Sequence, residues 1–144
     1  MKILISLLLL IVVLSSCRQG PTHGPKFLWK PYSKQAIADS IANQRPVVID
    51  FWAEWCPNCH DLDRTVFSLP QIQAKLYQVT ALRMDVTNQD DPDVQKVIQD
   101  YQVDGVPTVV FLDRKGKEID NSRVIGLVTP QEFSQALALL TIFK

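Results

Sequence analysis

Two cysteines, Cys56 and Cys59, are separated by two residues and follow closely on a short apolar run. The run from Val47 to Trp52 is rich in β-branched and aromatic residues, which predicts a strand buried on both faces. Pro57 indicates the first turn of a helix that begins beside the cysteines. Unpaired N–H groups and the positive end of the helix dipole favour a thiolate there. The spacing therefore predicts a dithiol that exchanges electrons with other thiols and disulfides.

Composition narrows the class of partner. A chain of 144 residues fits one domain with enough core to fold without further crosslinks. Its 15 basic and 15 acidic residues balance, so charge gives no reason to expect nucleic acid as a partner. We expect a monomer that acts on protein thiols and disulfides, with no metal at its site.

The N-terminus predicts export. Ile3 to Leu14 is almost entirely apolar, but as a helix it would reach only about 18 Å, short of the roughly 30 Å hydrocarbon core of a membrane. Residues 1–16 are therefore predicted to be a signal peptide. Leu14-Ser15-Ser16-Cys17 resembles the lipobox of bacterial lipoproteins, which implies that Cys17 is lipidated and becomes the first mature residue. The alternative is ordinary cleavage nearby, which leaves Cys17 a free thiol.

Export and lipidation together predict where the protein works. Lipidation of Cys17 leaves a single cysteine pair and holds the protein at a membrane surface. Residues 17–26 contain two prolines and two glycines, which predicts a flexible tether to a domain over residues 27–144. Outside the reducing cytosol a dithiol can cycle against other disulfides. We expect the periplasmic side of a bacterial membrane, either inner or outer.

Strand and helix patterns alternate along the rest of the chain. Strands are predicted at 27–29, 47–52, 79–86, 109–112 and 123–127, the last two joined by a turn at 114–117. Helices are predicted from a cap at Ser33, from the cysteines with an interruption near Pro70, from Asp91-Pro92, and from the capping box Thr129–Glu132. This order predicts the α/β class, with a central mixed sheet covered by helices on both faces.

Two motifs resemble a known family. The stretch Asp50–Cys59, which reads DFWAEWCPNC, and Gly105-Val106-Pro107-Thr108 resemble the two signatures of the thioredoxin family. The stretches Arg64–Ile72 and Asp85–Thr87 more narrowly resemble the C-terminal periplasmic thioredoxin-like domain of the disulfide reductase DsbD. The resemblance covers about residues 27–142 and implies a thioredoxin-like fold.

The resemblance also implies catalytic roles. Cys56 would attack a partner disulfide and Cys59 would resolve the mixed disulfide, so the redox-active centre is the Cys56–Cys59 pair without another cofactor. Asp50 matches the buried acid beneath the pair, which helps to move the proton of Cys59. Burial is expected to raise the pKa of Asp50 toward the working range.

Four residues are expected to bind the substrate. Pro107 matches the family's cis-proline, which lies against the cysteines. The Val106 backbone is then free to pair with an extended substrate segment, and Thr108 completes the motif. Trp55 is expected to border the reactive cysteine.

Charged residues near the dithiol bear on the direction of electron flow. Glu54 and Asp63 disfavour a thiolate, whereas His60 favours one only when protonated. Arg83 stands where the family often has a basic residue near the buried acid. We therefore expect Cys56 to keep a pKa near that of an ordinary thiol and the protein to act as a reductase. A disulfide oxidase or isomerase of the same fold is the alternative.

The sequence departs from the DsbD pattern in three respects. Pro57-Asn58 replaces a small apolar pair, and His60 replaces a usual lysine. No membrane electron-transfer domain is attached, so we expect a separate upstream membrane reductant.

Three other classes of function fit part of the same sequence. Cys56 to His60 satisfies C-x-x-C-H, the attachment motif of c-type haem, although Met84 is poorly placed as an axial ligand. A zinc site would need the two cysteines, His60 and His23. A binding module that has lost catalysis is the third alternative.

Overall fold

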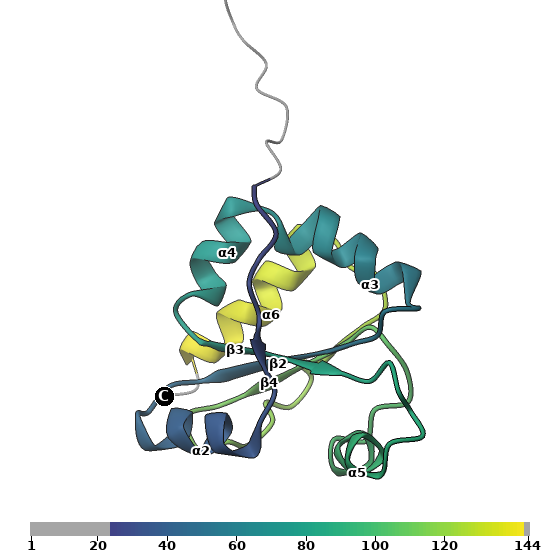
Figure 1. Cartoon of the computed structure of the whole chain (residues 1–144). Helices are drawn as coiled ribbons and strands as arrows, with labels where there is room; N and C mark the ends of the chain where they lie inside the picture. Colours follow the sequence, from purple (N-terminus) through teal and green to yellow (C-terminus); the bar gives the residue numbers. More distant parts are fainter. Residues whose placement is uncertain (1–23, 143–144) are drawn as a thin grey trace, which may run out of the picture.

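The computed structural model describes residues 24–142, in which five strands form one mixed sheet in the order β1-β3-β2-β4-β5 (Figure 1). The central strand β2 pairs in parallel with β3, which pairs in parallel with β1. On its other side β2 pairs with antiparallel β4, which pairs with antiparallel β5. The strands are β1 Lys30–Pro31, β2 Val47–Trp52, β3 Thr80–Asp85, β4 Thr108–Leu112 and β5 Val124–Ile125.

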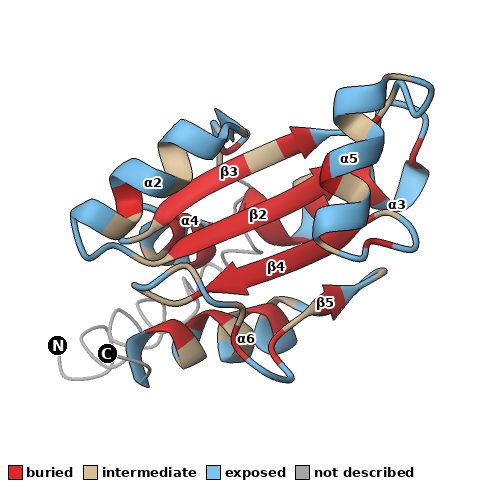
Figure 2. Cartoon of the chain, turned by 90° about the horizontal axis from the view of Figure 1, so that it is seen from below, coloured by how far each residue is buried: buried red, intermediate tan, exposed pale blue. Residues whose placement is uncertain are grey.

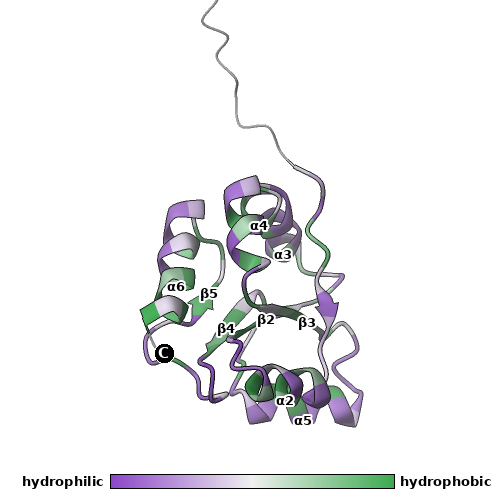
Figure 3. Cartoon of the chain, turned by 90° about the vertical axis from the view of Figure 1, so that its left-hand side faces the viewer, coloured by the Kyte–Doolittle hydropathy of each residue, from purple (hydrophilic) through white to green (hydrophobic). Residues whose placement is uncertain are grey.

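Helices cover both faces of the sheet. Figure 1 shows α3 (Pro57–Leu62), α4 (Pro70–Leu76) and α6 (Pro130–Ile142) above the sheet, with α2 (Lys34–Ala42) and α5 (Pro92–Asp100) below it. The side view in Figure 3 shows the same layers, with the sheet between the two sets of helices. A π-helical segment, η1 (Asp63–Phe67), follows α3 and precedes α4. The predicted α/β fold with a covered mixed sheet is confirmed.

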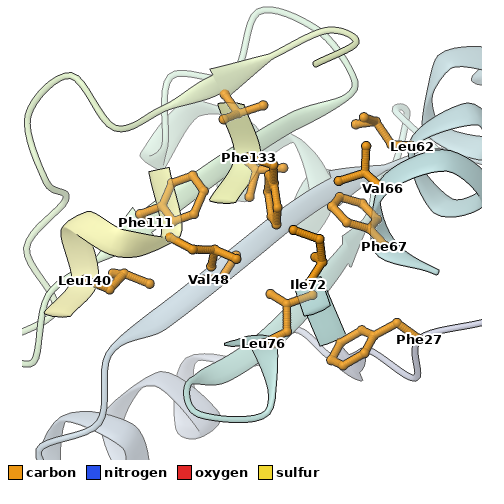
Figure 4. Close-up of a cluster of buried hydrophobic side chains, with 14 of the residues drawn as sticks. Phe27, Val48, Leu62, Val66, Phe67, Ile72, Leu76, Phe111, Phe133 and Leu140 are labelled. Carbon is orange, nitrogen blue, oxygen red and sulfur yellow. The ribbon is translucent and has the colours of Figure 1, made fainter. Parts of the chain in front are cut away.

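Alternating side chains of β2 and β4 build two cores. Val48 and Phe111 point toward α4 and α6, where they join Phe133 and Leu140 (Figure 4). Val47, Ile49 and the other alternate residues point toward α2 and α5. Both faces of the central strands are therefore buried, as Figure 2 shows. This explains the nearly continuous apolar run of β2.

Capping side chains fix three of the helix starts. Ser33 Oγ accepts the Ala36 N–H at 3.0 Å, and Asp91 Oδ1 accepts the Asp93 N–H at 2.8 Å. The predicted capping box closes in both directions, because Glu132 Oε2 accepts the Thr129 N–H while Thr129 Oγ1 accepts the Glu132 N–H.

Three elements differ from the sequence prediction. The edge strand lies at Lys30–Pro31 instead of 27–29, because ladder pairing with β3 begins only at Lys30. The returning strand is reduced to Val124–Ile125, because Gly126 adopts a φ of +75° and turns its N–H to the carbonyl of Pro107 at 2.9 Å. The helix after the cysteines widens into η1 before the break at Pro70, which the spacing of apolar residues did not indicate.

The end of the predicted tether contacts the domain. Gly24 N–H donates to the Ser68 carbonyl at 3.0 Å, and Gln73 Nε2 donates to the Pro25 carbonyl at 2.6 Å. The predicted signal peptide, Cys17 and the rest of the tether lie outside the described residues. Within residues 24–142, no helix combines the length and the apolar character needed to cross a membrane.

Candidate active site

A disulfide joins Cys56 and Cys59 at the start of α3, with the two sulfurs 2.13 Å apart. Cys56 is the N-cap of this helix, and its Sγ accepts the Cys59 N–H at 3.1 Å. Pro57 occupies the first turn, where its missing N–H costs no helical hydrogen bond. Both cysteines are buried, Cys56 with 3% and Cys59 with 1% of its surface exposed. The Cys56 sulfur therefore lies where a helix N-terminus stabilises negative charge.

The 105–108 loop has one cis peptide bond, between Val106 and Pro107. Val106 packs against the apolar cluster that contains both cysteines, so this loop and the disulfide share one part of the core. The Thr108 hydroxyl turns inward and donates to the Gly105 carbonyl at 2.7 Å. Any contact that Thr108 makes with a partner must therefore use its backbone.

Beside the disulfide helix, one arginine joins two carboxylates. Arg83 Nε and Nη2 lie 2.8 and 2.7 Å from Asp50 Oδ2, and Nη2 also lies 2.6 Å from Asp63 Oδ1. Asp50 is 1% exposed. The Asp63 N–H donates to the Cys59 carbonyl, so this ion cluster is one helical turn from the resolving cysteine. Lys26 Nζ lies 3.8 Å from Asp63 Oδ2 at the exposed side of the cluster.

Burial has the largest effect on the pKa of Asp50. It raises the pKa of this carboxyl from 3.8 to about 6, although the charge and hydrogen bonds of Arg83 lower it, and the neighbouring Asp63 contributes a further small increase. At neutral pH both protonation states of Asp50 are therefore accessible.

Two indole rings hold the guanidinium of Arg83. Its Cζ lies 5.2 Å from the Trp29 ring centroid and 5.3 Å from that of Trp52, within cation–π range. The Trp52 ring meets the His60 ring edge-on at 5.4 Å, and His60 Nε2–H donates to the Glu54 carbonyl at 2.8 Å. These contacts connect the ion cluster to the loop that carries the cysteines.

The loop between β2 and α3 is anchored to Thr87, which follows β3. The Glu54 N–H donates to Thr87 Oγ1 at 2.8 Å, and the Trp55 indole N–H donates to the Thr87 carbonyl at 3.1 Å. Trp55 is still 55% exposed beside Cys56, so it presents an apolar surface to solvent.

A sequence model of the thioredoxin-like domain matches residues 33–141. This chain belongs to that family. Among curated proteins of known name, it is 38% identical over 119 residues to the thiol:disulfide interchange protein DsbD of Pectobacterium atrosepticum, covering 81% of this chain and 20% of that protein. To the Escherichia coli K12 protein of the same name it is 35% identical over 103 residues, 72% of this chain and 18% of that one. The chain thus spans about a fifth of the length of these relatives.

Solved structures show the same thioredoxin-like fold. A thioredoxin from Thermus thermophilus superposes with a TM-score of 0.66 at 28% identity, covering 81% of this chain and 88% of that one. The reduced C-terminal domain of Neisseria meningitidis DsbD superposes with a TM-score of 0.64 at 22% identity, covering 77% and 93%. This thioredoxin-like domain is therefore a homologue of the thioredoxin-like domain of DsbD, and it carries a Cys-x-x-Cys disulfide.

The haem and zinc alternatives depend on the same residues as the disulfide. The haem motif lies at a strand–helix junction of a thioredoxin-like sheet, and Met84 is buried within β3. Of the four zinc ligands considered, His23 lies outside the described residues, and His60 bonds to a backbone carbonyl. Within residues 24–142 no three His, Cys, Asp or Glu side chains gather as a metal site would require.

The structure adds surface residues that the sequence did not identify. Ile125 and Leu127, 70% and 52% exposed, flank Gly126, whose N–H donates to the Pro107 carbonyl. They therefore extend the apolar surface beside the cis-proline. A glycine inside a strand pattern often marks a close approach of two backbones, so Gly126 was the sequence signal that could have indicated this surface. The pairing of Asp63 with Arg83 and the contact of Trp29 with Arg83 had no sequence signal, because both depend on tertiary packing.

Proposed function

We propose that the protein is an exported, lipid-anchored protein-disulfide reductase. It takes electrons from an upstream membrane reductant and passes them to disulfides of other proteins. The observation that carries this proposal is the Cys56–Cys59 disulfide at the N-terminus of α3, in a domain homologous to that of DsbD. Catalytic reduction of protein disulfides distinguishes this function from that of a thioredoxin-like module that only binds its partner.

The chemical step begins from the reduced dithiol. The Cys56 thiolate attacks one sulfur of the partner disulfide, forms a mixed disulfide and releases the other partner sulfur as a thiolate. Cys59 then loses its proton and attacks Cys56 Sγ, which releases the second partner thiolate. Two electrons pass to the partner, and the Cys56–Cys59 disulfide seen in the structure is the oxidised product. The upstream reductant restores the dithiol by the reverse exchange.

Asp50 serves as the proton acceptor for Cys59 in this proposal. Its burial and its pKa of about 6 support the role, since a base should titrate near the operating pH. Asp63 and Arg83 act as positioning residues, because they hold the carboxyl of Asp50 in one orientation.

The partner docks on the surface around the disulfide. Trp55, Ile125 and Leu127 supply exposed apolar contacts, and the backbone of Val106 to Thr108 pairs with an extended segment of the partner. Exposed aromatic residues are frequent anchors in protein interfaces, which supports the assignment of Trp55.

The ion cluster supports a reductase over an oxidase. Asp50 and Asp63 share one partly buried arginine, so these three groups carry a net negative charge whenever Asp50 is ionised, and the exposed Lys26, 3.8 Å from Asp63, offsets that charge only in part because water screens it. A negative charge one helical turn from Cys59 disfavours a thiolate in the cysteine pair, and oxidants depend on stabilising the Cys56 thiolate. Glu54 adds to this effect, whereas His60 opposes it only when protonated. Pro57 between the cysteines is compatible with oxidants of this fold and is the feature that favours the alternative.

The periplasmic side of a bacterial membrane is the proposed location. The predicted signal peptide at 1–16 and the lipobox at Cys17 support it, as does the homology to DsbD. The acyl chains on Cys17 then keep the active site near the membrane reductant.

A trapping experiment tests the function. Cys59→Ala leaves Cys56 able to form a mixed disulfide that cannot be resolved, so partners accumulate as covalent adducts in the native cell. Mass spectrometry after non-reducing electrophoresis identifies them. The matched control is the double variant with both cysteines changed to alanine. Adducts that are present in the first strain and absent from the second support the proposal, and no difference between the strains would point to a module without catalysis.

A further inference from the structure

A hollow lies at the end of the sheet opposite the disulfide. It consists of two adjoining pockets of about 530 and 500 Å³ that share Pro46, Gln78 and Arg114. Pro46 precedes β2, whereas the disulfide follows the other end of this six-residue strand. At about 3.3 Å per residue, roughly 20 Å separate the hollow from the redox centre. Figure 1 shows β2 running between these two ends.

One of the two pockets is mainly apolar. Val79, Leu137 and Leu140 line it, together with the exposed Ala138 on the same helix, α6. No aspartate or glutamate of residues 24–142 lines this pocket, and Lys75 lies at its edge with its Nζ donating to Ser134 Oγ. Its volume falls within the range of small-molecule sites, about 300–1,000 Å³. An apolar chain fits this lining better than a polar ligand does.

Arg114 stands where the two pockets meet, and its guanidinium lacks a partner. Its Nε is buried and makes no hydrogen bond, and no ion pair forms at this side chain within the described residues. The other four described arginines each bond to a carboxylate or a backbone carbonyl: Arg45, Arg64, Arg83 and Arg123. Because no carboxylate neutralises Arg114 within the described residues, the outer end of its guanidinium can pair with an anionic ligand.

The second pocket surrounds Arg114 with further positive charge. Lys30 and Arg45 line it, and Asp39 is the single carboxylate among the lining residues that the structure describes. The hollow thus combines a cationic mouth with an apolar wall. This arrangement matches a ligand that carries both an anionic group and a hydrocarbon chain.

We propose that the hollow is a second binding site, for an amphiphile with one carboxylate or phosphate group and an alkyl chain. The anionic group pairs with Arg114, and the chain lies against Val79 and Ala138, the less buried apolar residues of the lining. A free fatty acid and a lysophospholipid share this chemistry. The site makes no use of the dithiol, so it stands independently of the proposed reductase function.

Titration of the full-length oxidised protein with dodecanoate and with dodecyl phosphate, each below its critical micelle concentration, tests the site. Amide resonances of Arg114 and of Leu137 to Thr141 are expected to shift in NMR spectra, with saturation at one equivalent. The better binder identifies a carboxylate or a phosphate ligand. Inorganic phosphate and the uncharged dodecyl maltoside are expected to bind at least about tenfold more weakly, because each lacks half of the recognised chemistry.

Two variants locate the binding. Arg114→Gln removes the charge, and Ala138→Phe fills the apolar pocket from an exposed helix position; each is expected to weaken binding at least about tenfold. Arg64→Gln, at an exposed arginine that pairs with Asp61, is the matched control and should bind as the parent does. The proposal is overturned if neither amphiphile binds, if dodecyl maltoside binds equally well, or if Arg114→Gln binds like the parent.

Discussion

Asp50 and Arg83 are register partners on the parallel strands β2 and β3, and their side chains meet at 2.7 Å although 33 residues separate them in sequence. This pairing puts a guanidinium beside the one acid that β2 buries. Arg83 also pairs with Asp63, so three charged side chains form one cluster at the C-terminal end of α3. Their balance controls how readily Asp50 takes up a proton.

Removing the cation should raise the proton affinity of Asp50. Arg83 lowers the pKa of Asp50, so Arg83→Met is expected to move that pKa above its present value of about 6. Titration of the Asp50 carboxyl carbon by ¹³C NMR in the oxidised protein measures the change. Arg64→Met, which removes an exposed pair with Asp61, serves as the control and should leave the titration unchanged. A lower pKa in Arg83→Met would mean that water entry outweighs the lost charge.

The raised pKa of Asp50 also predicts a pH-dependent stability. The pKa is about 6 in the fold and 3.8 ordinarily, so the stability contributed by Asp50 is fully present below pH 3.8 and is lost as the pH rises through about 6. The loss amounts to about 3 kcal/mol. Asp50→Asn stays uncharged, so the variant should gain stability relative to the parent between pH 4 and pH 7.

Urea unfolding of both proteins at several pH values measures this gain. Most other titrating groups are common to the two proteins and cancel in the difference between their free energies of unfolding. A difference that stays constant from pH 4 to pH 7 would falsify the assignment of a raised pKa to Asp50.

The net negative charge of the cluster predicts a reducing potential. We expect the Cys56–Cys59 couple to lie closer to the value of thioredoxin, about −270 mV, than to that of the oxidant DsbA, about −120 mV. Equilibration with glutathione buffers, followed by thiol alkylation, gives the potential. Asp63→Asn should shift it toward more oxidising values, because the thiolate gains stability when a nearby carboxylate is removed. A parent value close to that of DsbA would favour the oxidase alternative.

Phe133 should be among the most sensitive core positions. Its ring is fully buried and lies 5.1 Å from the ring of Phe67 and 5.9 Å from that of Phe111 (Figure 4). Phe133→Ala is expected to lower the free energy of unfolding by about 3–5 kcal/mol, because it removes apolar contacts and leaves a cavity. Chemical denaturation measures the loss. Leu139→Ala on the same helix is the control at a partly buried site, and it should cost clearly less.

Local features of the sequence determined most of the fold. The run Val47–Trp52, the cap at Ser33 and the capping box at Thr129 are complete within a few residues, so their elements could be predicted. The Cys-x-x-Cys spacing likewise indicated a redox pair, since one helical turn brings two such sulfurs within bonding distance. The strand at 123–127 was predicted, but its reduction to Val124–Ile125 was not, because a distant carbonyl decides it. The π-helical η1 was not predicted either, because the packing of neighbouring turns decides it.

Only the tertiary structure decided how the charges are shared. Asp50, Asp63 and Arg83 lie on three different elements, and their pairing follows from the register of β2 on β3 and the position of η1 above them. Trp29, from a segment before the matched family region, completes the surroundings of Arg83. The same holds for Arg114, whose lack of a partner emerges only once α6 and the β2 end are in place. The sequence by itself determined which chemistry this protein carries, whereas packing over long sequence distances set its electrostatics, because charge–charge energies depend on separation and burial, which no local pattern encodes.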